Sequence, residues 1–280
     1  MGHRMSDLDA IGSAEGVLRI CKICDVPAVI AVRRDATLAG SLINALIAAG
    51  QEDDFIDPKG ALPIISQRTL CIVVDTYQLG LVESREILEK CGKVAVIDHH
   101  RKGVGFIEKA DLVCHEPYAS SASELVTEFL QYVGDRDDKP NRIEAEGLLS
   151  GIMLDTRDFT LHTGVRTFEA AAALRRYGAE TEHVRQLFDV SMVEYTTKAR
   201  LVSEAQMYRG CAITVSGEVA PEARVAIAQA ANDLLTIQNV EASFVAVQVG
   251  GGVNISARSL GAVNVQVIME SLGGGGHQTM

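Results

Sequence analysis

Two short apolar segments decide the fold, and both end on an aspartate. Residues 69–75 read Thr-Leu-Cys-Ile-Val-Val-Asp, and residues 94–100 read Val-Ala-Val-Ile-Asp-His-His. Continuous apolar runs of this length are typical of strands buried on both faces of a parallel sheet. Because the carboxyl ends of such strands border the crevice in which ligands bind, we expect Asp75 and Asp98-His99-His100 to lie at one site.

The surrounding sequence alternates between apolar strands and amphipathic helices. Helices are expected over residues 9–23, 38–49, 82–90, 122–133 and 142–154, strands over 28–32, 70–74 and 94–97, and a loop over 155–164. This alternation predicts an α/β fold in which helices flank a parallel sheet.

The pattern changes after a long polar stretch at 181–207, which is predicted to form one linker helix. Strands are then expected over 211–215, 242–249 and 253–257, with a helix over 221–235 and a turn at Gly250-Gly251-Gly252. The predicted domains are therefore a larger α/β domain at 1–180, the linker helix at 181–207, and a smaller α/β domain at 208–280. The active site is expected in the cleft between the domains.

Composition narrows the class of protein. The chain has 280 residues, of which 47% are hydrophobic and 22% charged, as in soluble globular proteins of about two domains. The formal net charge of -11 disfavours a broad basic face for duplex nucleic acid. The six cysteines lie mostly in apolar runs, and no secretory signal or membrane-length apolar segment is apparent, so a reduced cytoplasmic compartment is expected.

Carboxylates and imidazoles gather where strands are expected to end. The candidate ligands are His3, Asp7, Asp9, Asp75, His99 and Asp155. Such a cluster repels itself unless cations are bound. Its oxygen-rich donors suit Mn²⁺ or Mg²⁺, and six donors exceed the need of one catalytic ion, so two ions sharing a carboxylate are expected. Such a pair can hold a hydroxide for attack on a phosphoryl group.

Each of these residues also has a structural explanation. An aspartate that ends a strand is more often a turn or cap residue, and Asp7 or Asp9 can cap the helix that starts near Ala10. His3 can be a solvated terminal residue. Ser120-Ser121-Ala122-Ser123 fits a helix N-terminus, and His115, His162 and His183 lack ligand-like spacing. The joint occurrence of the acidic residues at successive strand ends favours a site.

These motifs together resemble those of the DHH phosphoesterase superfamily. The resemblance is carried by His3-x3-Asp7-x-Asp9, Val73-Val74-Asp75, Asp98-His99-His100 and Gly151-Ile-Met-Leu-Asp155. Ser256-Ala257-Arg258-Ser259 and residues 273–277, Gly-Gly-Gly-Gly-His, look like the DHH-associated C-terminal domain. Within the superfamily, Asp98-His-His-Arg101 and residues 264–270 are most similar to the catalytic region of GdpP-type cyclic-di-AMP phosphodiesterases.

The resemblance implies a role for each motif residue. His3, Asp7 and Asp75 would hold one Mn²⁺, and Asp9, Asp75, His99 and Asp155 the other, with Mg²⁺ or Co²⁺ as substitutes. Asp98 and His100 would be catalytic, with His100 beside the leaving oxygen. Substrate would be bound by Ser256, Arg258, Gly274, Gly275, Gly276 and His277.

The activity implied by the resemblance is hydrolysis of cyclic di-AMP to linear 5′-pApA. The alternatives are trimming of short oligonucleotides by a nanoRNase-type enzyme, a cyclic-dinucleotide sensor without turnover, and a family II inorganic pyrophosphatase, which the C-terminal motifs disfavour. The resemblance also implies a homodimer and a soluble fragment, truncated at its C-terminal end, of a membrane-anchored protein, with no membrane contact of its own.

Overall fold

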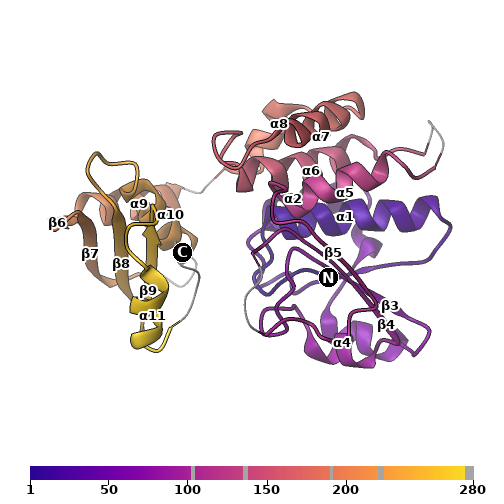
Figure 1. Cartoon of the computed structure of the whole chain (residues 1–280), viewed down its shortest axis with the longest axis horizontal. Helices are drawn as coiled ribbons and strands as arrows, with labels where there is room; N and C mark the ends of the chain where they lie inside the picture. Colours follow the sequence, from indigo (N-terminus) through magenta and orange to yellow (C-terminus); the bar gives the residue numbers. More distant parts are fainter. Residues whose placement is uncertain (102–104, 135–137, 190–191, 220–223, 275–280) are drawn as a thin grey trace. The chain divides into compact units, whose positions relative to one another are not determined.

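The structure is a computed structural model that describes residues 1–101, 105–134, 138–189, 192–219 and 224–274. It divides into two compact units, Met1–Asp189 and Val190–Met280 (Figure 1). The division falls inside the segment that the sequence analysis assigns to a linker. Each unit is an α/β structure with its own sheet and hydrophobic core.

The first unit is built on a parallel sheet of three strands, β3 (Leu70–Val74), β4 (Lys93–Asp98) and β5 (Leu112–His115). Val74 is opposite Ile97 and Asp98 is opposite His115, so β3 and β4 end at the same edge. A second, two-stranded parallel sheet pairs β1 (Ile30–Ala31) with β2 (Phe55–Ile56). The predicted parallel sheet and its flanking helices are therefore confirmed.

Alternate residues of β3 and β4 enter two different cores. Val74 and Ile97 pack in the core beneath the helices α1, α5 and α6, whereas Val73 and Val96 pack on the other face, which α4 covers (Figure 1). Both faces of the strands are apolar because both are covered.

The first unit contains eight α-helices and two short 3₁₀ turns among the described residues. They are α1 (Leu8–Ile23), α2 (Gly40–Ala48), η1 (Glu52–Asp54), α3 (Pro58–Ala61), η2 (Leu62–Ile64), α4 (Arg85–Lys90), α5 (Ala122–Leu130), α6 (Arg142–Asp155), α7 (Val165–Arg176) and α8 (Thr181–Gln186). Helices α1, α2, α4, α5 and α6 lie close to the predicted bounds, whereas β2, α3, β5 and α7 were not predicted.

The second unit has a mixed sheet in the order β6-β7-β8-β9. Its elements are α9 (Met192–Ser203), β6 (Gln206–Tyr208), β7 (Cys211–Glu218), α10 (Arg224–Leu234), β8 (Ala242–Val249), β9 (Gly252–Ser259) and α11 (Val265–Ser271). Strands β7 and β8 are parallel, and the other pairs are antiparallel. The predicted glycine turn joins β8 to β9, with positive φ angles at Gly250 and Gly251, as a tight two-residue hairpin requires.

The prediction of one helix over 181–207 is wrong. Helix α8 ends at Gln186, α9 begins at Met192, and residues 206–208 form β6. After α8 the N–H of Phe188 donates to the Arg185 carbonyl three residues earlier, and Leu187 and Phe188 pack against the core of the first unit. Burial of these apolar side chains and strand pairing of β6 with β7 override the helical polarity pattern.

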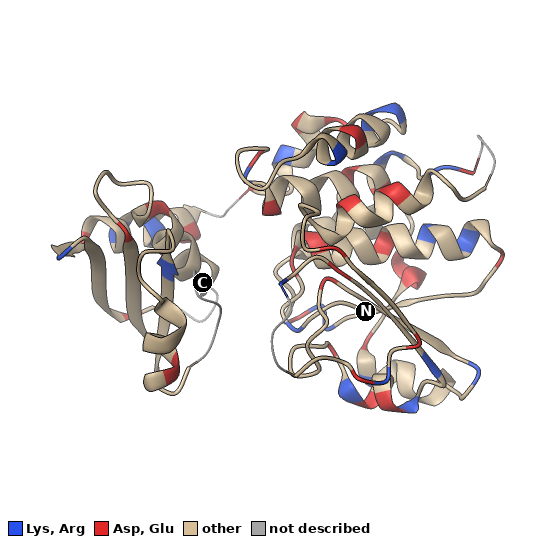
Figure 2. Ribbon diagram, viewed as in Figure 1, with Lys and Arg blue, Asp and Glu red and all other residues tan. Residues whose placement is uncertain are grey.

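The surface charges follow the composition. Lys and Arg are dispersed among Asp and Glu over both units in the view of Figure 2. Among the helices of the described ranges, none combines the length and apolarity needed to cross a membrane.

Candidate metal centre

Asp75 is placed by an unusual backbone turn at the end of β3. Its φ angle is +58°, in the left-handed region that few residues other than glycine adopt. The backbone N–H of Asp75 still donates to the Ile97 carbonyl of β4, at 2.9 Å, so the turn begins while the chain remains attached to the sheet. Strained conformations of this kind concentrate at functional sites, where the surrounding structure holds them in place.

His3 approaches Asp75 from the N-terminal segment. This segment pairs with residues 81–83 through an antiparallel bridge between His3 and Val82. The Nδ1 atom of His3 is 2.8 Å from the Arg4 carbonyl oxygen, which as an acceptor requires a proton on Nδ1. Its Nε2 atom lies 3.3 Å from Oδ2 of Asp75 and 3.8 Å from Oδ1 of Asp7. A histidine held through Nδ1 in this way offers Nε2 to a metal.

Asp7 and Asp9 differ in their roles at the start of α1. Asp7 is the N-cap, and its Oδ1 accepts hydrogen bonds from the N–H groups of Asp9 and Ala10 at 3.0 and 3.1 Å. Asp9 is fully buried, and its two oxygens accept from the N–H groups of Ala122 and Ser123 at 2.7 and 2.8 Å. The N-terminus of α5 therefore orients Asp9, while Asp7 both caps α1 and faces His3.

In the Asp98-His99-His100 turn, Asp98 stabilises the turn while His99 points toward the other candidate ligands. Oδ1 of Asp98 accepts from the backbone N–H groups of His99 and His100, at 2.9 and 3.3 Å, and lies 2.8 Å from Nδ1 of the His100 ring. Asp98 thus folds the turn and orients His100. His99 points instead toward Asp155, whose Oδ2 lies 3.0 Å from its Nε2, and toward Oδ1 of Asp75 at 3.4 Å.

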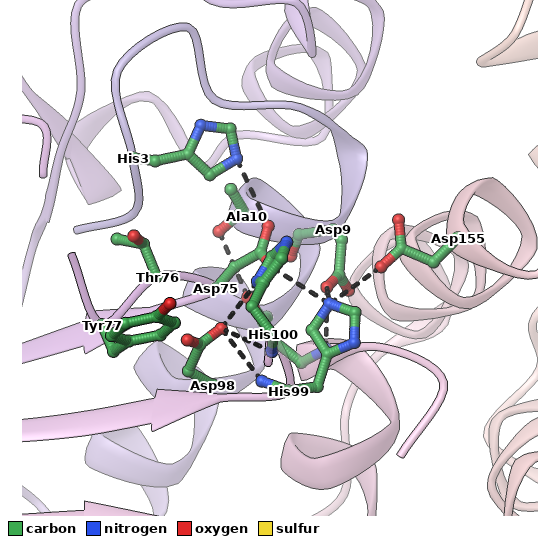
Figure 3. A network of polar contacts seen from close by, with 12 residues as sticks. His3, Asp9, Ala10, Asp75, Thr76, Tyr77, Asp98, His99, His100 and Asp155 are labelled. Atoms are coloured by element: carbon green, nitrogen blue, oxygen red, sulfur yellow. Dashed lines mark hydrogen bonds and ion pairs between the residues drawn. The ribbon is translucent and has the colours of Figure 1, made fainter. Parts of the chain in front are cut away.

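The six predicted ligands converge on a common space, as Figure 3 shows for those it labels. Together with His100, their donor atoms form three overlapping groups, each within 4.8 Å: His3, Asp7 and Asp75; Asp75, His99 and His100; and Asp9, His99 and Asp155. Asp75 belongs to two groups and faces His3 with one oxygen and His99 with the other. This is the placement that a bridging carboxylate requires.

Two buried polar atoms in the centre fit a cation. Nε2 of His99 and Oδ1 of Asp75 are buried and make no hydrogen bond to any described residue. The Asp155 oxygen is within reach of His99 by distance, but the pair lacks hydrogen-bond geometry. Unsatisfied buried atoms are uncommon in folded proteins because each carries a desolvation penalty. Their convergence with other oxygen and imidazole donors fits a bound hard divalent metal ion.

The pKa shifts of the histidines and carboxylates in the centre also indicate that this space favours bound positive charge. Burial lowers the pKa of His3, but interaction with the carboxylates of Asp7 and Asp75 outweighs it and raises the pKa to about 11. Burial likewise opposes protonation of His99, yet Asp155 and Asp75 raise its pKa well above the ordinary value. Burial, with some repulsion from neighbouring carboxylates, raises the pKa of Asp155 to about 6, despite the opposing effect of His99. A bound cation relieves this repulsion in place of protons.

The remaining predicted residues belong to the second unit. Ser256 and Arg258 are two residues apart on β9, and Arg258 donates from Nε to the Asn232 side chain of α10 and from Nη1 to the Ala257 carbonyl. Gly274 follows α11. Gly275, Gly276 and His277 lie outside the described residues. The part of these residues in a shared site stays a prediction, as does the interdomain cleft.

Two supporting residues were not identified from the sequence. His115, whose spacing gave no sign of a site role, ends β5 and bonds through Nε2 to the backbone carbonyl of His100. Tyr77 packs edge-on against the His115 ring and donates from its hydroxyl to the Arg101 carbonyl at 2.7 Å. Both brace the backbone that carries His99 and His100. Their spacing in the sequence carries no signal because the contact arises from strand pairing.

Comparison with known proteins agrees with this geometry. Residues 1–152 match the N-terminal domain of the DHH family, and residues 219–280 match the DHHA1 domain. The chain is 46% identical over 284 residues to a cyclic-di-AMP phosphodiesterase GdpP of Geobacillus thermodenitrificans. It is 42% identical over 282 residues to the cyclic-di-AMP phosphodiesterase PdeA of Listeria monocytogenes. These alignments cover 100% and 99% of the chain but 43% of each relative.

The fold is also similar to that of a solved structure. An exopolyphosphatase-related protein from Bacteroides fragilis aligns with a TM-score of 0.82 over 99% of this chain and 84% of the other, at 20% identity. The family match covers more than half of the chain and includes five of the six predicted ligands. The chain belongs to the DHH family.

Proposed function

We propose that this chain is a metal-dependent phosphodiesterase that hydrolyses cyclic di-AMP to linear 5′-pApA. The observation that carries the proposal is the pair of donor groups joined by Asp75, with the Asp98–His100 pair beside them. Its relatives at 46% and 42% identity, named as cyclic-di-AMP phosphodiesterases, support the choice of substrate.

Two Mn²⁺ ions are the proposed cofactors, with Mg²⁺ or Co²⁺ as substitutes. His3, Asp7 and Asp75 would hold one ion, and Asp9, Asp75, His99 and Asp155 the other. Such ions make water a stronger nucleophile and neutralise charge that develops on phosphorus oxygens.

His100 is the proposed proton donor to the leaving group. In hydrolysis, water forms a new bond to phosphorus, the bond from phosphorus to the 3′ oxygen breaks, and that oxygen takes up a proton. Asp98 holds Nδ1 of His100, which selects the tautomer and leaves Nε2 as the nitrogen that exchanges the proton. Burial lowers the pKa of His100, but hydrogen bonding to Asp98 and attraction to Asp75 outweigh it and raise the pKa above its ordinary value, the direction that suits a proton donor.

The second unit is proposed to bind the substrate through Ser256, Arg258, Gly274, Gly275, Gly276 and His277. A guanidinium meets a phosphate through two parallel hydrogen bonds, and glycines let backbone N–H groups approach phosphate oxygens closely. We also propose that the chain acts as a homodimer, and as the catalytic part of a longer membrane-anchored protein.

The test is product analysis of the purified chain with Mn²⁺. Cyclic di-AMP, cyclic di-GMP, linear pApA and pyrophosphate are offered separately at equal concentration. Preferential conversion of cyclic di-AMP to pApA supports the proposal. Rapid conversion of pApA to AMP with little hydrolysis of cyclic di-AMP would instead assign the chain to the oligonucleotide-trimming enzymes. Tight binding of cyclic di-AMP with no product in the presence of any metal ion would indicate a sensor.

A further inference from the structure

A pocket with aromatic walls lies in the first unit, outside the set of metal ligands. Its volume is about 780 Å³, within the range of small-molecule sites. Arg101, Tyr118, Phe159 and Phe168 are among the residues that line it.

The pocket adjoins the metal centre along the chain. Arg101 directly follows His100, and Phe159 comes four residues after Asp155. The third lining segment ends at Ala119, three residues before the N–H group of Ala122 that holds Asp9. At most about 14 Å of extended chain therefore separates Arg101 from His100 and Phe159 from Asp155, and at most about 11 Å separates Ala119 from Ala122.

Phe159 is held rigidly at the wall of this pocket. It has a φ angle of +61°, the last of three consecutive residues in the left-handed region. The buried Thr156 anchors the loop, because its hydroxyl accepts from the N–H of Phe159 at 2.9 Å and its carbonyl accepts from Thr160 and Leu161 at 2.8 Å. The Phe159 side chain also packs against the hydrophobic core. An aromatic ring fixed in a strained loop beside a reactive centre indicates a binding role.

Phe168 extends this wall into solvent. Its ring is stacked on that of Phe159, with 5.7 Å between centroids and 16° between planes. Phe168 remains 57% exposed and Tyr118 is 94% exposed. An exposed aromatic ring backed by a second, nearly parallel ring, with a guanidinium in the same pocket, is a combination that binds nucleobases next to phosphates.

We propose that this pocket is a nucleobase subsite, in which a purine ring of the dinucleotide stacks on the free face of Phe168, which Phe159 supports from the other side, while Arg101 contacts the adjoining phosphate. The inference rests on the proposed function, since it names where that substrate places one base. A purine suits the wall because its flat apolar face covers the exposed ring of Phe168 and its attached phosphate reaches toward the metal centre.

The chain contains no tryptophan, so Phe168→Trp introduces a single reporter at this wall. AMP, which has no diester bond to cleave, is titrated with Mn²⁺ present. Stacking of adenine should quench the fluorescence saturably, while ribose 5-phosphate, which lacks a base, should not. Tyr132→Trp is the matched control, because Tyr132 is 89% exposed and lines none of this pocket, and its fluorescence should not change.

Kinetics with cyclic di-AMP provide the second readout. Phe168→Ala should raise KM at least about 5-fold with kcat within about 2-fold, as expected for loss of one stacking contact, and Phe168→Tyr should restore KM. A KM for Phe168→Ala equal to that of the wild type, or an unquenched reporter at saturating AMP, overturns the subsite. Absence of any hydrolysis by the wild type refutes the proposed function instead, and the AMP titration then still tests the subsite.

Discussion

At the scale of single residues, Asp98 orients its neighbours through hydrogen bonds and is not one of the candidate metal ligands. Its Oδ1 contacts the His100 ring and two backbone N–H groups, and Asp98 belongs to none of the three donor groups. A carboxylate in this position fixes the histidine tautomer, which an amide cannot do in the same way.

Asp98→Asn is therefore expected to lower kcat by about 10²- to 10⁴-fold, because the His100 ring loses its anionic partner. Bound Mn²⁺, measured by elemental analysis after gel filtration, should remain at the wild-type ratio. Asp75→Asn is the comparison variant, since it removes a shared ligand and should lose metal and activity together. Loss of metal in Asp98→Asn would show that Asp98 is a ligand after all.

The sequence predicts which site residues lie close together but not which hydrogen bonds orient each of them. Asp75, Asp98 and His99 were predictable as neighbours because parallel strands end at one edge. The hydrogen bonds that orient Asp9 were not predictable, because the N–H groups that donate them lie more than a hundred residues away, at the start of α5. Such a contact depends on helix packing, which local periodicity does not encode.

At the scale of elements, glycine sets the distance between α1 and α6. A Cβ atom on Gly12 would lie 2.3 Å from the carbonyl oxygen of Gly147, and one on Gly151 would lie 2.5 Å from Oδ1 of Asp9. The two helices carry Asp7, Asp9 and Asp155, so their separation positions ligands on both sides of the centre.

Gly12→Ala is expected to destabilise the first unit by about 2 kcal/mol, since overpacking against backbone exceeds the gain in helix propensity of about 1 kcal/mol. Denaturant unfolding measures the change. Gly40→Ala, in helix α2, is the matched control, because a Cβ atom at this position would have no neighbouring atom within 4 Å. This variant should be as stable as the wild type or slightly more stable. Equal stability of both variants would contradict close packing of α1 on α6.

A buried carboxyl lies farther along the same interface. Glu15 on α1 is buried, and its Oε1 accepts from Gln51, which also donates to Glu144 of α6. Burial, followed by repulsion from Glu144 and Asp54, raises the pKa of Glu15 from 4.5 to about 8, against the opposing charges of Lys22 and Arg19. The folded protein therefore binds a proton that the unfolded chain releases in this range.

Because the folded pKa is the higher one, the stability contributed by protonated Glu15 is complete below pH 4.5 and is lost as the pH rises toward 8. The expected slope reaches about 1.4 kcal/mol per pH unit while the group titrates. Glu15→Gln should flatten the decline measured by urea unfolding between pH 5 and 8. Glu52→Gln, at a side chain that is 70% exposed, should leave it intact, and an unchanged slope in Glu15→Gln would refute this origin.

Elements differ in how well the sequence predicts them, and burial explains the difference. Strand β3 and helix α6 are recognisable because their apolar residues enter a covered core. Strand β5 lies at the sheet edge with Leu112 and Val113 exposed, and α7 exposes Val165 while it buries Thr167, so residue polarity does not mark the buried face of either element. The helix predicted over 181–207 failed because Leu187 and Phe188 turn inward to the core.

At the scale of the whole molecule, metal binding is expected to stabilise the first unit and not the second. All three donor groups lie within the first unit, between His3 and Asp155, and the chain carries a net charge of -11. A cation that binds only the folded centre stabilises the unit that contains it, by about 2.7 kcal/mol at a hundred times its dissociation constant.

Mn²⁺ is therefore expected to slow hydrogen exchange in one unit alone. Amides of α1 and β3 should gain protection, because opening of these elements separates Asp9 and Asp75 from the other donors. Amides of β7 and β8 should exchange at the same rate with and without the ion, and Asp75→Asn should abolish the effect in the first unit. Equal protection of β7 and β8 would mean that the second unit contributes to metal binding, and the assignment of all ligands to residues 1–189 would then be wrong.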